Sequence, residues 1–476
     1  MLILAMVAVA ALNVRLTVHA ADPGSARELP AQPLTLVGAV AYGLEHNLGL
    51  QATGEEIQAA DQGVRQAQAD FLPKVDAGFS STHLEDAPFA RLNGLQFQTS
   101  HSDLNRWETL VTQPLFTGHA LTAQYRSTKL QRDQATHHRE ETRLDLIRNI
   151  HRTFLQTLQA EKLLQVQRDT IYQLEAHRHN AQAYYAQGLT PQNDVLKADV
   201  ALADARQKEQ SAAKQVRVLR SQLNQLLGVD LAAQLELAEW DRLPDPGRPE
   251  PDLGELFSRA ENQRPELLAL DTAILQTEEG KRLAMSRLYP QAALFASYYQ
   301  EGKNFLGTEN DFTNAHNAAV GVKVGWNWFE GGKTYAAVKE WRYRRRALED
   351  RRQDALRQIY VQIQDAREQL QVSRANLETA RVSIQQAKEN ERITVIQYQQ
   401  QVVVFSEVLD AQVFMTQVQV NYFQALYGYQ LAWADLERAV GGTLRENEAG
   451  LVGAASRPAT RPARGHPAKV GTLPRQ

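Results

Sequence analysis

The sequence contains no cysteine, and glycine and proline are scarce, with 27 and 17 copies in 476 residues. The absence of cysteine excludes a disulfide scaffold, thiolate zinc sites and cysteine nucleophiles. Scarce glycine and proline favour long uninterrupted helices. An excess of positive charge is also missing, since 52 Lys and Arg stand against 55 Asp and Glu. We therefore expect no nucleic acid partner, because phosphate binding needs a concentrated basic surface.

Signatures of catalysis are missing as well. The sequence has no G-x-S-x-G, no H-E-x-x-H and no glycine-rich phosphate loop, so it predicts neither an enzyme nor a cofactor. Two histidine pairs, His137 with His138 and His177 with His179, are one and two residues apart. Side chains at these spacings do not converge on one side of a helix, so we predict no metal site.

Apolar runs are short throughout the chain. None reaches the length of about 18 residues that a transmembrane helix needs. The run from Leu2 to Leu12, followed by Val18-His19-Ala20, is typical of an export signal, so we predict a signal peptide at 1–20 and an N-terminal extension at 21–33. A cytosolic helix stays open as an alternative, because no Lys or Arg precedes the run. Residues 443–476 are rich in Ala, Arg, Gly and Pro and predict a disordered tail.

What the chain does contain is an internal repeat. Phe116-Thr117-Gly118 matches Phe329-Glu330-Gly331, and Asp194-Val195-Leu196 matches Glu407-Val408-Leu409, both at an offset of 213 residues. Each half therefore predicts one unit with the order helix, strand, loop, strand, very long helix, shorter helix. The predicted divisions are 34–228 for the first repeat, 229–250 for a linker and 251–442 for the second repeat.

Helix lengths follow from the same pattern. The segment from Gly118 to Gly188 has no proline and would be roughly 105 Å long as one helix, and Gly331 to Gln400 is equivalent. The flanking pieces, 34–72 and 191–228, would each be roughly 57 Å, so two of them match one long helix. A heptad repeat in the second long helix predicts supercoiling against partner helices. Its positions are Leu356, Ile363, Leu370, Leu377 and Ile384, each followed three residues later by Ile359, Ala366, Ser373, Ala380 and Ala387.

Alternation of apolar with small or polar residues predicts strands. Val320, Val322, Val324, Trp326 and Trp328 share one face of such a segment, opposite Ala319, Gly321, Lys323, Gly325 and Asn327. This pattern is typical of a strand between lipid and an aqueous lumen, although a half-buried soluble sheet shows it too. Three further strands are predicted around Val75, Ala77 and Phe79, around Trp107, Thr109 and Val111, and around Leu294, Ala296 and Tyr298.

Four strands are too few to close a barrel. Open edges in hydrocarbon leave backbone groups unpaired, so at least two chains must combine their strands. Two chains or three would both satisfy this requirement.

In these features the chain resembles the TolC family of outer-membrane channel proteins, from about Leu34 to Gly442. The resemblance rests on the tandem repeat and on a set of motifs in a fixed order: Leu72-Pro73, Leu115-Phe116-Thr117-Gly118, Tyr185-Ala186-Gln187-Gly188-Leu189-Thr190, Tyr289-Pro290 and Trp328-Phe329-Glu330-Gly331. It implies a homotrimer with a 12-stranded β-barrel in the lipid of the outer membrane and a long helical tunnel in the periplasm. It also implies two partners, a periplasmic adaptor (membrane fusion) protein and an inner-membrane pump or secretion ATPase.

The resemblance further implies where the periplasmic mouth lies. Acidic residues that encircle the aperture fall on Glu407 and Asp410, one helical turn apart, and threefold repetition would stack two rings of carboxylates that attract cations. A solvated helix face is the alternative for both. Asp194 and Tyr398 match positions whose links hold the mouth shut. Gly188, Leu189 and Thr190 keep the pattern of adaptor contact.

The second tip departs from the family. Gln401 replaces the usual Gly, and Val403 replaces an Arg whose ion pair with Asp194 would close the mouth. The apolar tip, Val402, Val403, Val404 and Phe405, predicts a hydrophobic constriction or an adaptor contact.

Two other groups of residues concern the membrane boundary. Trp107, Trp326 and Trp328 predict an aromatic belt. A basic run below the barrel predicts a solvated or ion-paired face, with lipid headgroup binding or lumen charge as the alternatives. The run consists of Arg342, Arg344, Arg345, Arg346, Arg351 and Arg352.

Together these features predict a passive duct through which an efflux pump discharges its substrate. A type I protein secretion duct would have the same body, and a coiled-coil scaffold outside any membrane is the alternative of a different class.

Overall fold

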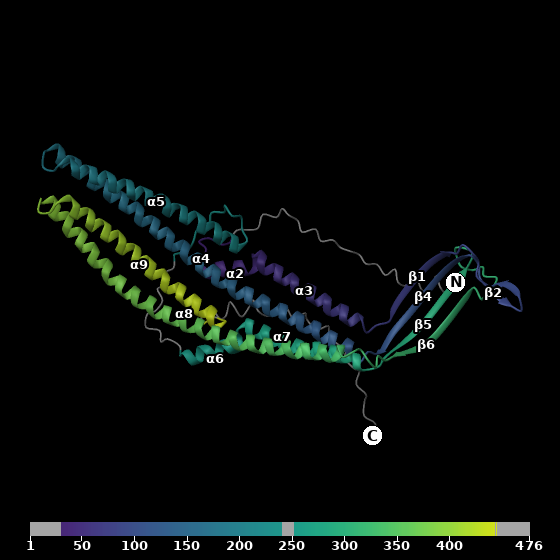
Figure 1. The fold of residues 1–476 in the computed structure, drawn as a ribbon. Helices are drawn as coiled ribbons and strands as arrows, with labels where there is room; N and C mark the ends of the chain where they lie inside the picture. Colours follow the sequence, from purple (N-terminus) through teal and green to yellow (C-terminus); the bar gives the residue numbers. More distant parts are fainter. Residues whose placement is uncertain (1–29, 240–251, 443, 445–476) are drawn as a thin grey trace, which may run out of the picture.

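The computed structural model describes residues 30–239, 252–442 and 444. The molecule is elongated, with its long helices at one end and a β-sheet at the other (Figure 1). The predicted signal peptide and the tail, apart from Leu444, lie outside the described residues, as do 21–29 of the extension and 240–250 of the linker. No helix in the described ranges is long and apolar enough to cross a membrane.

Both halves of the chain build the same elements in the same order, which confirms the predicted repeat. The first half forms α2 (Leu36–His46), α3 (Leu48–Ala69), β1 (Lys74–His83), β4 (Asp103–Phe116), α4 (Ala120–Ala186) and α5 (Gln192–Leu227). The second half forms α6 (Leu253–Gln263), α7 (Pro265–Met285), a 3₁₀ turn (Ser286–Leu288), β5 (Gln291–Gly302), β6 (His316–Gly325), α8 (Lys333–Gln399) and α9 (Phe405–Val440).

The long helices have the predicted length. α4 and α8 contain 67 residues each, which corresponds to about 100 Å. α8 packs along α9, α4 packs along α5, and α9 lies against α4. Every predicted heptad position of α8 is buried or half-buried, so the heptad is the face that α8 turns toward its neighbours.

The helix that precedes the sheet is interrupted once in each repeat, and the expectation of one helix over 34–72 is wrong. Asn47 ends α2, and its side-chain oxygen accepts a hydrogen bond from the Leu50 N–H at 2.9 Å to begin α3. Its amide donates to the Leu226 carbonyl at the end of α5 at 2.9 Å. The equivalent interruption falls at Arg264, where Pro265 starts α7, a position at which the missing N–H of proline costs nothing.

The four predicted strands form one antiparallel sheet in the order β1-β4-β5-β6, so the two repeats meet at its centre. Pro73 and Pro290 stand directly before β1 and β5, as expected. The outer strands, β1 and β6, have no second partner strand among the described residues. The sheet therefore has two free edges.

The register gives the sheet two chemically different faces. One face carries Val75, Val111, Ala296 and Val320 in a single row across all four strands. Other rows of the same face carry Phe79 with Trp107, and Leu294 with Val322. The opposite face is polar and charged, with Lys74, Asp76, Glu108, Arg106, Glu301 and Lys323.

The strand pattern differs from expectation at two places. β6 ends at Gly325, so Trp326 and Trp328 follow the strand instead of lying on it. A small hairpin, β2 (Phe89–Leu92) with β3 (Leu95–Gln98), was not expected. Its turn, Asn93-Gly94, is left-handed at both residues (φ 53° and 82°), the conformation of a two-residue hairpin turn. The hairpin lies at the end of the sheet farthest from the helices (Figure 1).

Candidate channel mouth

The two helix tips lie side by side at the end of the molecule farthest from the sheet (Figure 1). The first tip joins α4 to α5 and turns at Gly188, which has φ 74°. The second tip joins α8 to α9 and turns at Gln401, which has φ 61°. Residues other than glycine rarely adopt this left-handed backbone conformation. The second tip therefore has glutamine in a turn that glycine forms without strain.

An apolar cluster packs the two tips against each other. Tyr398 and Phe405 from the second tip are buried with Ala181 of α4, and their ring centroids lie 5.4 Å apart. The ring of Tyr184, on α4, lies edge-on to that of Tyr398 at 5.8 Å. Because residues of both repeats share this cluster, separating the tips exposes apolar surface to water.

The predicted pair Asp194 and Tyr398 lies within this region, and both residues are buried. No hydrogen bond joins them, and the Tyr398 hydroxyl has no partner among the described residues. Burial, together with the nearby charge of Asp194, raises the pKa of Tyr398 to about 12. The Nζ of Lys197, three residues further along α5, lies 4.0 Å from the Asp194 carboxylate.

The carboxylates of Glu407 and Asp410 are exposed, and neither forms an ion pair within the described ranges. They lie in the first two turns of α9, where the positive end of the helix dipole stabilises the negative charge of Glu407. Phe414, one turn further along the same face, is 54% exposed. Phe414 is not among the predicted mouth residues, because spacing alone does not distinguish an exposed aromatic side chain from a buried one.

The residues of the predicted apolar tip divide into two pairs. Phe405 is fully buried and Val403 is half-buried against the cluster of Tyr398. Val402 and Val404 point outward and are 68% and 64% exposed. In this protomer the apolar surface of the tip therefore consists of these two valines.

The first tip presents a similar surface. Leu189 is 50% exposed beside the exposed Gly188. Thr190 is half-buried, and its hydroxyl has no partner in the described part of the chain. The two tips thus place exposed aliphatic side chains at the same end of the molecule.

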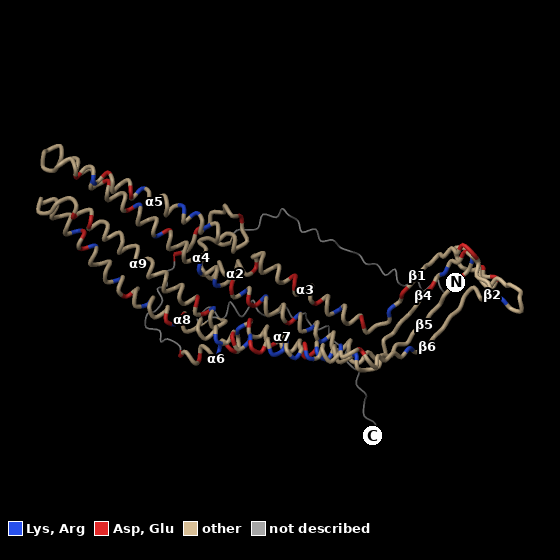
Figure 2. The backbone as a smooth tube through the Cα atoms, viewed as in Figure 1, with Lys and Arg blue, Asp and Glu red and all other residues tan. Residues whose placement is uncertain are grey.

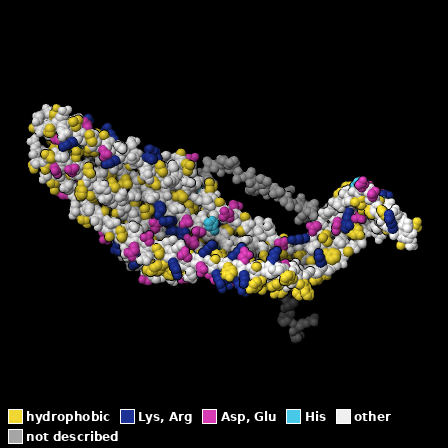
Figure 3. Space-filling model, in the orientation of Figure 1, with side chains coloured by type: hydrophobic (Ala, Val, Ile, Leu, Met, Phe, Trp, Pro, Cys, Tyr) yellow, Lys and Arg dark blue, Asp and Glu magenta, His cyan; other side chains and the backbone are white. Residues whose placement is uncertain are grey.

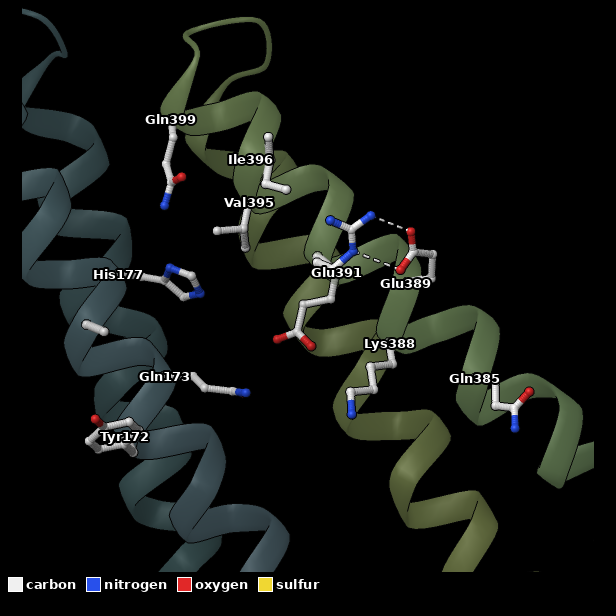
Figure 4. Close-up of a pocket in the computed structure, with 12 residues that line it drawn as sticks. Tyr172, Gln173, His177, Gln385, Lys388, Glu389, Glu391, Val395, Ile396 and Gln399 are labelled. Carbon is white, nitrogen blue, oxygen red and sulfur yellow. Dashed lines mark hydrogen bonds and ion pairs between the residues drawn. The ribbon is translucent and has the colours of Figure 1, made fainter.

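A groove of about 570 Å³ runs between α4 and α8 close to the tips. Figure 4 shows His177 on α4 facing Val395 and Glu391 on α8 across it. Burial lowers the pKa of His177 and raises that of Glu391. The groove has no catalytic arrangement, and the described residues contain no group of three metal-ligating side chains.

The three tryptophans of the predicted aromatic belt lie at both ends of the sheet. Trp107 donates its indole N–H to the Phe305 carbonyl at 2.9 Å and contacts the ring of Phe79 at 4.6 Å between centroids, at the far end. Trp326 donates to the Leu288 carbonyl at 3.1 Å and packs on Trp328 where the sheet meets the helices. Figure 3 shows hydrophobic side chains gathered at this junction.

The geometry described so far defines a membrane channel protein with a sheet for the bilayer and long helices that extend from it. Comparison of the sequence with protein families agrees. The model of the family described as "Outer membrane efflux protein" matches residues 43–229 and again residues 256–442. The chain belongs to this family. It is therefore an outer-membrane channel protein with its helical tunnel in the periplasm, and a conduit rather than an enzyme.

Solved structures with the same fold include three of known source. The Campylobacter jejuni CmeC outer membrane channel has a TM-score of 0.73 and 16% identity, covering 88% of this chain and 89% of that chain. A membrane protein from Pseudomonas aeruginosa gives 0.73 and 17%, with 86% and 90% covered. The open state of the Neisseria gonorrhoeae MtrE outer membrane channel gives 0.67 and 16%, with 86% and 89% covered. Among curated proteins, none matches the sequence.

Proposed function

We propose that three copies of this chain form the exit duct of a tripartite efflux pump, opened at its periplasmic mouth by an adaptor protein. The observation that carries the proposal is the sheet with an apolar row across all four strands and a free edge on each side. Each free edge leaves backbone groups unpaired in hydrocarbon, and pairing β1 of one copy with β6 of the next removes this cost. Three copies contribute the 12 strands that the resemblance implies.

The duct acts passively. The charged face of the sheet, with Arg106 close to Glu108 and Glu301, lines the lumen, and the apolar row meets lipid. The tips close the other end through the cluster of Tyr398 and Phe405, and docking of the adaptor supplies the free energy that separates them. The energy for transport comes from the inner-membrane pump.

Glu407 and Asp410 form the rings that select ions at the mouth. In a trimer they place six exposed carboxylates around one aperture, with Phe414 directly inside. Such rings attract cations and repel anions. Val402 and Val404 lie at the rim, where they line a hydrophobic constriction or contact the adaptor.

The test is single-channel recording in a planar bilayer, with wild type compared with a Glu407→Gln, Asp410→Asn double variant. We expect discrete cation-selective steps from the wild type and a loss of most of the selectivity in the variant. A Glu389→Gln variant is the control, because Glu389 is exposed near the tip but already paired with Arg392 at 2.6 Å.

Other outcomes would change the proposal in defined ways. Steps that are indifferent to the double substitution would move the selective constriction to Val402 and Val404. A monomer in detergent by native mass measurement would contradict the trimer. Export of a protein instead of small solutes, when adaptor and pump are supplied, would assign the chain to type I secretion.

A further inference from the structure

The first four turns of α8, directly after the sheet, carry three cations on one face. Lys339, Arg342 and Arg346 follow Tyr335 at intervals of four, three and four residues, which places them in one line along the helix. We call these three residues the cationic stripe. All of them are exposed. Figure 2 shows basic positions crowded at this end of the helical part.

The stripe differs from the rest of the basic run in its partners. Arg344 pairs with Glu340 at 2.5 Å, and Arg352 pairs with Asp271 at 2.5 Å. Arg345 pairs with Glu349 at 2.7 Å and also with Glu278. The three residues of the stripe form no ion pair with any described carboxylate. Their positive charge is therefore available to a ligand.

Two aromatic rings direct the stripe toward the sheet. The Lys339 ammonium lies 4.6 Å from the ring centroid of Tyr335, and the Arg346 guanidinium lies 5.9 Å from that of Tyr343. In both pairs the ring is closer to the sheet than the cation's own backbone is. Helical side chains also lean toward the helix N-terminus, which here is the end that meets the sheet. The charged groups thus point toward the membrane.

The depth of the stripe matches the lipid headgroups. Trp328 and Phe329, 81% and 85% exposed, mark the boundary between the sheet and the helices. Lys339 lies six residues after the start of α8, about 9 Å along the helix, and Arg342 about 14 Å. The headgroup layer is roughly 5–8 Å thick, and long side chains extend several Å back toward it. Arg346 lies one turn further from the sheet, about 20 Å along the helix, and its side chain extends back to within about a Debye length of the headgroups.

The stripe also lies on the outer side of the helices. Further along the same face of α8, the ring of Tyr360 contacts Phe257 of α6 at 5.5 Å between centroids. A helix packed on the inner face would fill the duct, so the face that carries both α6 and the stripe is the outer one. It therefore looks toward the lipid boundary instead of the lumen.

We propose that the cationic stripe binds the headgroups of anionic phospholipids in the periplasmic leaflet of the outer membrane. The guanidinium groups of Arg342 and Arg346 can donate paired hydrogen bonds to phosphate oxygens, and Lys339 adds a point charge. The apolar row of the sheet holds the channel in the bilayer, and the stripe fixes how deep it sits and in which rotation. Anionic lipid is thus a structural ligand of the channel.

The test counts phosphatidylglycerol molecules bound to the intact channel in neutral detergent by native mass spectrometry, with phosphatidylcholine as the uncharged comparison. The test variant is Lys339→Gln, Arg342→Gln, Arg346→Gln. Each juxtamembrane cation contributes about a fivefold change in affinity, so we expect roughly a 100-fold weaker preference for phosphatidylglycerol in the triple variant. A charge-retaining variant, Lys339→Arg, Arg342→Lys, Arg346→Lys, should keep most of the preference.

The matched control changes cations at similar depth on the other side of the helix. Arg344 and Arg351 are exposed and lie about half a turn away from the stripe. We expect Arg344→Gln, Arg351→Gln to bind phosphatidylglycerol within twofold of wild type. If the triple variant fails to fold by circular dichroism, Arg342→Gln against Arg351→Gln gives the same comparison, with an expected difference of about fivefold.

Three results would overturn the proposal. The first is equal binding of phosphatidylglycerol and phosphatidylcholine by the wild type. The second is a triple variant that keeps the preference. The third is displacement of phosphatidylglycerol by an equal concentration of inorganic phosphate, which would make the stripe a site for free phosphate.

Discussion

Left-handed residues recur at equivalent places in the two repeats. Gly118 and Gly331 begin the strand-to-helix junctions, His119 and Gly332 follow them, and Gly228 and Gly441 end the shorter helices, all with positive φ. The tips complete the series with Gly188 and Gln401. The conformation has therefore been kept at each position while the residue has changed at two of them. A non-glycine residue in this conformation costs about 1–2 kcal/mol.

We predict that Gln401→Gly stabilises the second tip by about 0.5–1 kcal/mol, because the relief of strain exceeds the extra flexibility of glycine in the unfolded chain. The change should appear as slower hydrogen exchange of backbone amides at residues 398–404. The reciprocal variant, Gly188→Gln, should speed exchange at the first tip. If both substitutions change exchange in the same direction, the turn conformation is not what limits tip opening.

At the scale of the element, the effect of a substitution in the sheet depends on which face of its strand the side chain occupies. Val320 lies in the apolar row and is 77% exposed in the protomer, whereas its neighbour Ala319 lies on the charged face opposite Ser297. The same substitution at these adjacent positions therefore meets lipid in one case and water in the other.

We predict that Val320→Lys destabilises the folded channel by about 2–4 kcal/mol, the cost of a lysine on the lipid face near the bilayer midplane. Ala319→Lys should cost less than about 1 kcal/mol. Folding yield into lipid vesicles from urea, measured over a range of urea concentrations, gives both values. Equal losses at the two positions would mean that the apolar row does not face lipid.

The elements themselves were the most predictable part of the fold. The strand at 316–325 follows from the alternation around Val320, and α8 follows from its heptad. The interruption at Asn47 was not predicted, because a capping asparagine has the same sequence signal as any polar residue within a helical pattern. The Asn93-Gly94 hairpin turn is a recognisable local signal that the sequence analysis did not use. The inward turn of Phe405 depends on the shape of the tip, which the spacing of residues does not fix.

At the scale of the whole molecule, a partly buried charged cluster around Arg438 joins the repeats midway along the helices. Arg438 of α9 donates to Asp145 of α4 at 2.6 Å and to Glu266 of α7 at 2.8 Å, and its side chain is only 12% exposed. Arg264, beside it, also binds Glu266 at 3.0 Å. The cluster therefore links three helices from both halves of the chain.

We predict that Arg438→Met destabilises the protein by about 2–3 kcal/mol, because it leaves the carboxylate of Asp145 without a cation and that of Glu266 with Arg264 alone. Arg148→Met should cost about 1 kcal/mol or less, since the pair of Arg148 with Asp435 is about one-third exposed. Urea unfolding of the detergent-solubilised channel measures both. A loss in Arg438→Met no larger than that in Arg148→Met would show that the cluster does not join the repeats energetically.

The same cluster predicts sensitivity to acid. Burial acts to raise the pKa of Glu266, but Arg264 and Arg438 outweigh it and hold the pKa below its ordinary 4.5. A carboxyl with a lowered pKa stabilises the fold above its ordinary value, and the contribution is lost as pH falls from there through the folded-state pKa. The loss of stability of the wild type below about pH 4.5 should therefore be larger than that of Arg438→Met.

The duplicated tips have a consequence for symmetry. In the proposed trimer the tips would alternate around the mouth, three built on Gly188 and three on Gln401, so a ring of six similar positions is in chemical terms two interleaved rings of three. A partner with identical subunits that binds along the axis would meet two kinds of site in alternation. Six partner subunits would have to bind both kinds of site, whereas three could bind one kind only. The difference of one residue between the two tips, Gly188 and Gln401, would thus bear on the stoichiometry of the assembly.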